Sequence, residues 1–355
     1  MPYWENHVRK VVPYTPGEQP KESGIIKLNT NENPYPPSPA VKSAYDAFDC
    51  ADMRLYPAPD ASELVGAIAE TYGVKPSQVF VGVGSDDVIS MAFMTFFGSD
   101  RPILFPDITY SFYDVWAEVY GIPYERVPLT AGFHIDPKDY IRPNGGIIFP
   151  NPNAPTGVLE STEMIEKVIS GSPDSVVIID EAYIDFAGSG KSVLPLVSKY
   201  ENLLVVQTFS KSRSMAGMRI GYAIGSEKLI KYMNDVKFSV NSYTMNRVTI
   251  KCGAAALRDT AYFEETVAKI VKTRENAKSE LSARGFEFPD SQSNFIFAKP
   301  PKLPAKTVFA ELKKRRIYVR FWDKPVIGDY LRITVGTDDE MNALYKALDE
   351  ILQEA

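Results

Sequence analysis

The chain has 355 residues, of which 45% are hydrophobic and 24% charged, so it is long enough for one large or two smaller globular domains with an ample core. Its formal net charge is −6 without blocks of like charge, which argues against nucleic acid or an anionic membrane as a partner and favours a small molecule. Two histidines, two cysteines and only short apolar stretches predict neither a zinc site nor a membrane span.

The first forty residues are rich in proline and asparagine, as in LNTNENPYPPSP. Proline removes a backbone donor and restricts the residue before it, so this stretch predicts an extended arm that lies on another part of the protein. The N-terminal MPYWENHVRK lacks the apolar core of a signal peptide, and Cys50 and Cys252 are far apart. We therefore expect a cytoplasmic protein without disulfides.

From about residue 79 to 225, short apolar runs alternate with helical patterns. Such alternation predicts an α/β fold with a mostly parallel central sheet that carries helices on both faces. Ligands of these sheets bind outside the carboxyl ends of the strands. We assign residues 50–245 to this large domain.

The pattern changes after residue 245 to a long helix, a strand, a second helix, two strands and a last helix. This order predicts a smaller α+β domain over residues 246–355. Residues 1–49 would supply the N-terminal arm and part of the small domain.

Polar residues follow several of the predicted large-domain strands. GVGSDD is not a dinucleotide fingerprint, because Asp87 occupies the place of the third glycine. Ser85 and Asp86 can instead cap a helix, either as ordinary caps or with its first backbone N–H groups left facing an anion. Further along the chain come Asp180, Tyr183, Ser210, Lys211 and Arg219.

Each of these residues has an ordinary explanation when it is taken alone. Lys211 could reach water from a strand end, Asp180 could bond a neighbouring strand, and Tyr183 could belong to the core. Together they match the needs of pyridoxal 5′-phosphate: a lysine for the aldehyde, an aspartate for the pyridinium nitrogen, a tyrosine for the ring oxygen, and an arginine, hydroxyls and a helix N-terminus for the phosphate.

With these residues in this order, the chain resembles the fold type I pyridoxal-phosphate aminotransferases and, among them, the histidinol-phosphate aminotransferases. The similarity runs almost from end to end, in family order. The blocks that carry it are LNTNENPYPPSP, RLYPAPDASELVGAIA, VGVGSDD, ITYSFY, PNPNAPTG, IIDEAYIDF, TFSKSRSMAGMRIGY, SNFIFAKP, IYVRFW and YLRITVGT.

The resemblance implies a role for each matching residue. Lys211 would bond covalently to the cofactor aldehyde and later shuttle a proton between Cα and C4′, while Asp180 would keep the pyridine nitrogen protonated. Tyr183 would bond the 3-oxygen and Tyr110 would stack on the ring. The implied phosphate ligands are Ser85, Asp86, Thr208, Ser210 and Arg219, together with Tyr56 from the neighbouring subunit of a homodimer whose active site lies at the interface.

Substrate binding would rest on Arg320 and Arg332, since a guanidinium can bind the carboxylate of glutamate or 2-oxoglutarate and the phosphate of histidinol phosphate in turn. The ordinary alternative for either arginine is an exposed ion pair. Tyr14 and Asn33 in the arm match family positions that close over the substrate.

Two positions depart from the family pattern. Ala154 stands where the family carries an asparagine that bonds the 3-oxygen, so that either Tyr183 makes this bond alone or Asn153 or a water assists. Ile108 replaces a proline before Thr109 and Tyr110. Losing one hydrogen bond to the ring oxygen typically changes the stability of the interaction by about 1 kcal/mol. We therefore expect a cofactor site with altered properties that remains functional.

The leading hypothesis is transfer of an amino group between histidinol phosphate and 2-oxoglutarate, a step of histidine synthesis. An aromatic amino acid aminotransferase or a threonine-phosphate decarboxylase would carry similar cofactor blocks. A ligand-sensing domain of a transcription regulator is a further alternative, but the chain has neither a helix-turn-helix nor a basic face.

Overall fold

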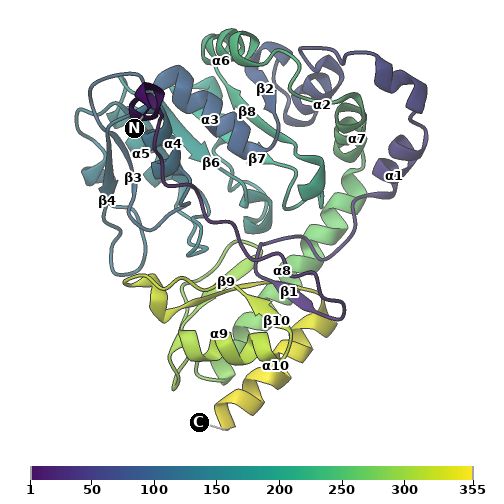
Figure 1. Cartoon of the computed structure of the whole chain (residues 1–355), viewed down its shortest axis with the longest axis vertical. Helices are drawn as coiled ribbons and strands as arrows, with labels where there is room; N and C mark the ends of the chain where they lie inside the picture. The colour runs from purple at the N-terminus through teal and green to yellow at the C-terminus, as the bar shows by residue number, and fades with distance from the viewer. Residues whose placement is uncertain (1, 354–355) are drawn as a thin grey trace.

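The computed structural model describes residues 2–353. It consists of a large body around a central sheet and a smaller body beneath it, and helix α8 (Thr260–Ala283) runs from one to the other (Figure 1). The predicted α/β class, with a mostly parallel sheet and a smaller α+β unit, is confirmed. Among the described residues, no helix is both long and apolar enough to cross a bilayer.

The large body contains a seven-stranded sheet in the order β2-β8-β7-β6-β5-β3-β4. Strand β8 is antiparallel to both of its neighbours, whereas the other pairs are parallel. All residues of β5, β6 and β7 are buried, as expected for central strands that are covered on both faces. The strands are β2 (Val79–Gly82), β3 (Ile103–Pro106), β4 (Tyr124–Val127), β5 (Gly146–Pro150), β6 (Val177–Asp180), β7 (Leu203–Thr208) and β8 (Gly221–Gly225).

Alternate residues of the central strands enter two separate cores. Ile179 packs in one cluster with Leu64, whereas the neighbouring Ile178 packs in the other with Ile89. This is the two-residue period of a strand buried on both faces. The first face is covered by α1 (Pro39–Asp46), α2 (Ser62–Tyr72), α5 (Thr162–Gly171) and α7 (Arg247–Arg258), and the second by α3 (Ser85–Phe96), α4 (Tyr113–Tyr120) and α6 (Glu227–Val240).

The small body has two short strand pairs packed against helices. β9 (Phe295–Ala298) pairs with β11 (Leu331–Thr334) in antiparallel fashion, and β1 (Ile26–Leu28) pairs with β10 (Ile317–Val319) in parallel. A bridge between Arg320 and Arg332 joins the two pairs. The helices of this body are the lower part of α8, α9 (Ala305–Lys314) and α10 (Asp338–Gln353).

Packing divides the chain at a different place from the sequence pattern. Helix α7 follows residue 246, yet Ile250 and Leu257 lie in the core of the large body. Val41 of α1 lies in that core as well. We therefore propose that the small domain comprises β1 together with the chain from α8 onward.

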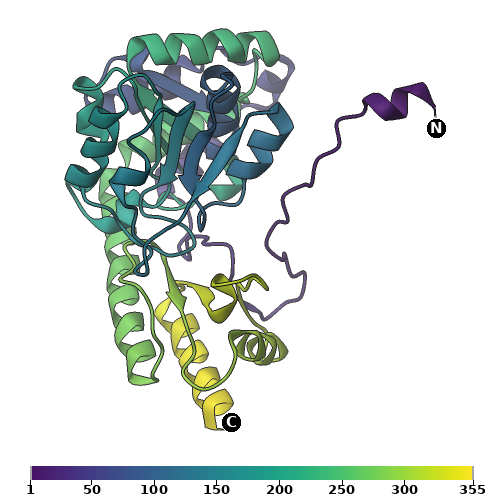
Figure 2. The same ribbon diagram turned by 90° about the vertical axis from the view of Figure 1, so that its left-hand side faces the viewer.

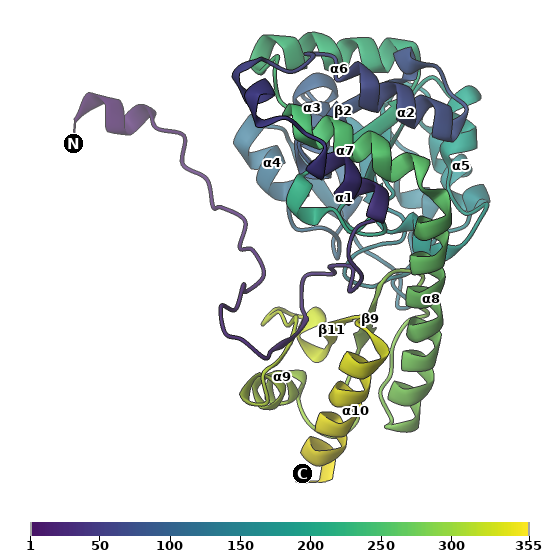
Figure 3. The same cartoon turned by 90° about the vertical axis from the view of Figure 1, so that its right-hand side faces the viewer.

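The N-terminal arm is extended, as its prolines predict. Its outer end, a short 3₁₀ turn at Tyr3–His7, projects away from both bodies (Figures 2 and 3). Closer to the body, the arm lies against both domains: the Tyr14 ring stacks on Phe112 at 4.1 Å between centroids, and Arg320 donates to the Thr15 and Pro16 carbonyls. The arm thus crosses the junction between the two bodies.

Gly221 allows β8 to approach the start of α3. A Cβ atom at this position would lie 2.2 Å from the backbone of Gly84 and Ser85. We expect Gly221→Ala to lower the free energy of unfolding by about 1–3 kcal/mol, because backbone cannot yield as a flexible side chain can. Urea unfolding measures this change.

Gly66 provides the matched control. It lies inside α2, and no described atom outside its own helix would be within 4 Å of a Cβ added at this position. Gly66→Ala should stabilise the protein by about 0.5–1 kcal/mol, because alanine is the better helix former. Equal effects of the two substitutions would contradict the close approach at Gly221.

Candidate active site

The carboxyl ends of β6 and β7 and the start of α3 open onto a cavity of about 440 Å³ that the small body and the arm help to enclose. Most of the residues singled out from the sequence line it. They are Tyr14, Ser85, Asp86, Tyr110, Asp180, Tyr183, Thr208, Ser210, Lys211, Arg219, Arg320 and Arg332.

One end of the cavity is built to hold an anion. Helix α3 begins at Ser85, and its N-cap is Gly84, so neither Ser85 nor Asp86 caps it as the sequence suggested. No described side chain caps the first turn, which leaves its N–H groups and the positive end of the helix dipole facing the cavity. The Thr208 and Ser210 hydroxyls, which lie 3.0 Å apart, line the same cavity, and Gly221 separates Thr208 from the start of α3.

Arg219 completes this end of the cavity. It has the left-handed backbone conformation (φ 54°), and its guanidinium contacts the Asp86 carboxylate at 3.1 Å. A Cβ on Gly84 would lie 2.3 Å from that guanidinium, so only glycine lets the arginine reach this position. The other oxygen of Asp86 accepts from the Tyr110 hydroxyl at 2.8 Å, which fixes the Tyr110 ring in the wall.

Asp180 is a buried carboxylate at the end of β6. One oxygen accepts from the Tyr113 hydroxyl at 3.0 Å and the other from the Ala182 N–H at 3.2 Å. Burial raises its pKa to about 6, although both hydrogen bonds oppose that rise. The described residues form no ion pair with it, so a cation in the cavity would be its natural partner.

Lys211 and Tyr183 lie together in the same cavity. The Lys211 Nζ is 5.7 Å from the centre of the Tyr183 ring and donates to the Thr30 carbonyl at 3.2 Å. The Tyr183 hydroxyl is 3.0 Å from the Asn31 side-chain amide. A primary amine, a phenol and a buried carboxylate therefore share one enclosure.

The small body contributes two arginines to the cavity. Arg332 is half-buried with its Nε inaccessible to solvent, and this desolvation lowers the pKa of the guanidinium. One of its terminal nitrogens donates to the Asn29 carbonyl at 3.0 Å, while its Nε has no partner among the described residues. The Trp322 indole lies 5.2 Å from both the Arg332 and the Arg320 guanidinium, so two cations that line the same cavity contact one aromatic ring.

Three residues singled out from the sequence do not line the cavity. Asn33 donates to the backbone carbonyls of Lys211 and Ser212 at 3.0 and 3.1 Å, so it fixes the lysine loop. The Asn153 amide donates to the Ile108 carbonyl and to Thr156, and only Ala154 beside it faces the cavity. Tyr56 is 79% exposed on the surface.

Sequence reasoning missed Tyr113, Asn31 and Trp322. Tyr113 had a detectable signal, because it falls three residues after Tyr110 at the start of an apolar helix. Asn31 had none, because its partners are distant in the chain: 152 residues separate it from Tyr183 and 303 from Thr334.

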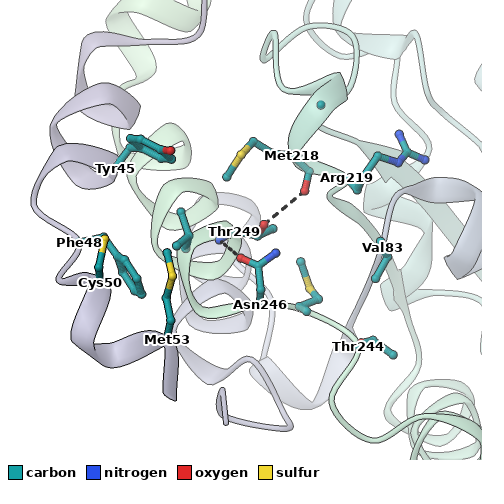
Figure 4. Close-up of a pocket in the computed structure, with 13 residues that line it drawn as sticks. Tyr45, Phe48, Cys50, Met53, Val83, Met218, Arg219, Thr244, Asn246 and Thr249 are labelled. Carbon is teal, nitrogen blue, oxygen red and sulfur yellow. Dashed lines mark hydrogen bonds between the residues drawn. The ribbon is translucent and has the colours of Figure 1, made fainter. Parts of the chain in front are cut away.

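A second cavity of about 440 Å³ lies on the other side of Arg219 (Figure 4). It is lined by Tyr45, Phe48, Cys50 and Met53 on one side and by the turn at Met218 and the start of α7 on the other. Tyr45 and Met53, which line it, are exposed by 60% and 66%. This surface is therefore apolar and borders the anion end of the first cavity.

Comparisons with known proteins agree with this geometry. Residues 23–348 match the model of the family described as aminotransferase class I and II. The chain is 49% identical over 350 residues to the histidinol-phosphate aminotransferase of Lactococcus lactis subsp. cremoris strain SK11. The aligned region covers 99% of this chain and 98% of that protein. It is 50% identical over 353 residues to histidinol-phosphate aminotransferase 2 of Dechloromonas aromatica, with 98% and 99% covered.

A solved structure shares the fold. Histidinol-phosphate aminotransferase from Sinorhizobium meliloti, determined in complex with pyridoxal-5′-phosphate, superposes with a TM-score of 0.86 at 21% identity, covering 93% of this chain and 91% of that one. This likeness confirms the fold type I architecture that the sequence predicted.

The raised pKa of Asp180 predicts a pH-dependent cost of folding. The folded protein holds a proton on Asp180 up to about pH 6, whereas the unfolded chain releases it near pH 4. Stability that is present at low pH is therefore lost as the pH rises through 6. Asp180→Asn removes this loss and should stabilise the cofactor-free protein at pH 8 by about 2–3 kcal/mol.

Urea unfolding at a series of pH values tests this prediction. The advantage of Asp180→Asn should shrink steadily between pH 6 and pH 4. Asp174→Asn, at an exposed position, should produce no such trend. An advantage that is the same at every pH would show that burial of the charge is not its source.

Proposed function

Because this chain belongs to the class I and II aminotransferase family, we propose that it is a pyridoxal-phosphate-dependent histidinol-phosphate aminotransferase. It exchanges an amino group between L-histidinol phosphate and 2-oxoglutarate, giving imidazole-acetol phosphate and L-glutamate. Relatives of that name, 49% and 50% identical over nearly the whole chain, support this substrate. The observation that carries the proposal is the single cavity in which Lys211, Asp180 and an anion cradle converge.

The residues present fit the cofactor. The free N–H groups at the start of α3, the Thr208 and Ser210 hydroxyls and the Arg219 guanidinium suit its phosphate. The Asp180 carboxylate suits a protonated ring nitrogen, because a cation removes the cost of burying that charge. Tyr110 and Tyr183 would contact the ring, and Tyr113 would hold Asp180 in place.

When bound, the cofactor supplies an aldehyde for covalent attachment and a ring that accepts electrons. The chain supplies the rest of the chemistry. Lys211 Nζ would provide the amine for attachment and would carry the proton that leaves the substrate Cα. The Thr30 carbonyl and Asn33, which bonds the lysine's own backbone, hold this amine in position. Asn153 acts indirectly by shaping the loop that carries Ala154.

The arginine pair would recognise the substrates. Arg332, whose buried Nε has no partner among the described residues, is suited to a carboxylate. Arg320, which lies near the same Trp322 ring, would bind a second anionic group. Arg320 is also bonded to the arm that carries Tyr14, so substrate binding would be linked to the position of the arm. A phosphate and a γ-carboxylate can therefore use the same site in turn.

We propose that two copies of the chain form a homodimer. Tyr56 is exposed and does not line the active-site cavity of its own chain. Its carbonyl accepts from Arg247 at the start of α7, and this end of α7 also lines the second cavity (Figure 4). Arg219 lines both cavities, so a second copy seated on this surface would approach the phosphate end. Tyr56 of each copy would then serve the site of the other.

We place the enzyme in the cytoplasm. Both of its cysteines are free, one exposed and one buried, which suits a reducing compartment.

Half-reactions with the cofactor-loaded protein test the substrate. L-histidinol phosphate should convert the visible band of the lysine-bound cofactor into that of its amine form, with an oxo product and no carbon dioxide. Phenylalanine and phosphothreonine should convert it far more slowly, because each presents only part of the charge and shape that the arginine pair and Tyr14 would recognise.

Lys211→Ala should lack the visible band of the lysine-bound cofactor, whereas Lys228→Ala, on the surface, should keep it. An unchanged spectrum in Lys211→Ala would contradict the covalent role of this residue. Faster conversion by phenylalanine favours the aromatic aminotransferase, and carbon dioxide from phosphothreonine favours the decarboxylase.

Mixing of two impaired variants tests the shared site. Lys211→Ala and Tyr56→Ala should each be impaired alone at limiting cofactor. In a mixed dimer, the site with an intact Lys211 receives an intact Tyr56 from its partner, so subunit exchange should restore about a quarter of the sites. The measurement is activity before and after mixing; no recovery between subunits that do exchange would mean that Tyr56 does not cross the interface.

A further inference from the structure

Asn31 connects the small body to the Tyr183 hydroxyl. It lies just after β1, is 1% exposed, and adopts the left-handed backbone conformation with φ 55°. Its carbonyl accepts from the Asn294 side chain at 3.1 Å, and its backbone N–H donates to the Thr334 hydroxyl at 3.0 Å. Two segments of the small body therefore fix its position.

The hydrogen bonds also fix which way the Asn31 amide points. A backbone N–H can only donate, so the Thr334 oxygen accepts from Asn31 and its own proton is free for another acceptor. That acceptor is the Asn31 Oδ1, 3.1 Å away. The amide nitrogen consequently faces Tyr183 and donates to its hydroxyl oxygen at 3.0 Å.

This arrangement determines where the Tyr183 proton goes. The hydroxyl oxygen accepts from Asn31, so its own proton points elsewhere, and no described residue accepts it. Tyr183 lines the cavity beside Lys211. The proton is thus available to a ligand in the cavity, and the donated bond from Asn31 makes the hydroxyl a stronger donor.

No other described amide near the Tyr183 hydroxyl can replace Asn31 as its donor. Ala154 faces the cavity without a polar group, and the Asn153 amide is already engaged by the Ile108 carbonyl and Thr156. Of the described amide side chains in this wall, only that of Asn31 reaches the hydroxyl.

We propose that Asn31 is a positioning residue that directs the Tyr183 hydroxyl proton into the cavity, onto the oxygen of an aromatic ring ligand. This inference rests on the proposed function, in which that ligand is the cofactor. It assigns to the chain segment after β1 a role in tuning the ring chemistry. Because Thr334 sets the Asn31 amide, the tuning depends on the small body being in place.

The test is the pH at which the visible band of the cofactor-loaded protein is half converted. A donor to the ring oxygen stabilises its negative form, so loss of the donor should raise this midpoint by about one pH unit. Tyr183→Phe gives the reference shift. Asn31→Asp, which keeps the shape and tolerates the left-handed backbone, accepts the Tyr183 proton instead of donating and should give nearly the same shift.

Three further variants separate the hydrogen bond from added charge and from stability. Asn31→Asp should change the pH midpoint only slightly in the Tyr183→Phe background, because the Tyr183 hydroxyl through which Asn31 acts is gone. Asn29→Asp adds the same charge to the same wall without a contact to Tyr183 and should shift the midpoint far less. Thr334→Ser, which keeps the hydroxyl, should leave the midpoint in place.

The outcomes are distinguishable. A wild-type protein without a visible band would refute the proposed function itself. A normal band with an unshifted midpoint in Asn31→Asp, even with lower thermal stability, would overturn the role of Asn31. So would a shift that is equally large in the Tyr183→Phe background or in Asn29→Asp.

Discussion

The carboxylate of Asp180 lies buried at the end of a central strand, where no described residue forms an ion pair with it, and the site depends on this constraint. Two hydrogen bonds from Tyr113 and Ala182 hold it, yet burial still raises its pKa to about 6. The next residue makes an instructive contrast. Glu181 is just as deeply buried, but it faces the opposite side and accepts from Ser192, Val193 and Gln207. Glu181 is a structural acid, whereas Asp180 keeps part of its capacity for a cationic ligand.

The sheet explains why this charge meets its partners. Strands β6 and β7 are parallel neighbours, so their carboxyl ends place Asp180 and Thr208 at the same edge, and the loop after β7 returns Lys211 to it. The antiparallel β8 then brings Gly221 against the start of α3, which places Arg219 at the anion cradle. The sheet thus places the Arg219 guanidinium and the Asp180 carboxylate at different points of the same cavity.

Much of this arrangement could be predicted from the sequence, because the large-body residues lie at the ends of apolar strands. Asp180 ends β6, Lys211 follows β7, and Arg219 lies two residues before β8. Edge strand β4 was harder to recognise, since its residues Glu125 and Arg126 are exposed and break the apolar pattern. The cap of α3 was also misjudged: Gly84 takes that position because only a glycine fits beneath Arg219.

What the sequence could not reveal are contacts between segments that fold together only in three dimensions. Asn33 and Asn31 lie two residues apart in the same motif, yet Asn33 turns to the backbone of the lysine loop and Asn31 to Tyr183. No local pattern distinguishes them, since the left-handed turn at Asn31 is imposed by Thr334 and Asn294 from the far end of the chain. The polar group closest to the Tyr183 phenol therefore belongs to the segment that joins the arm to the small body. Movement of the small body would shift both Asn31, which donates to the Tyr183 hydroxyl, and the arginines Arg320 and Arg332. Substrate recognition and ring chemistry therefore depend on the position of the same body.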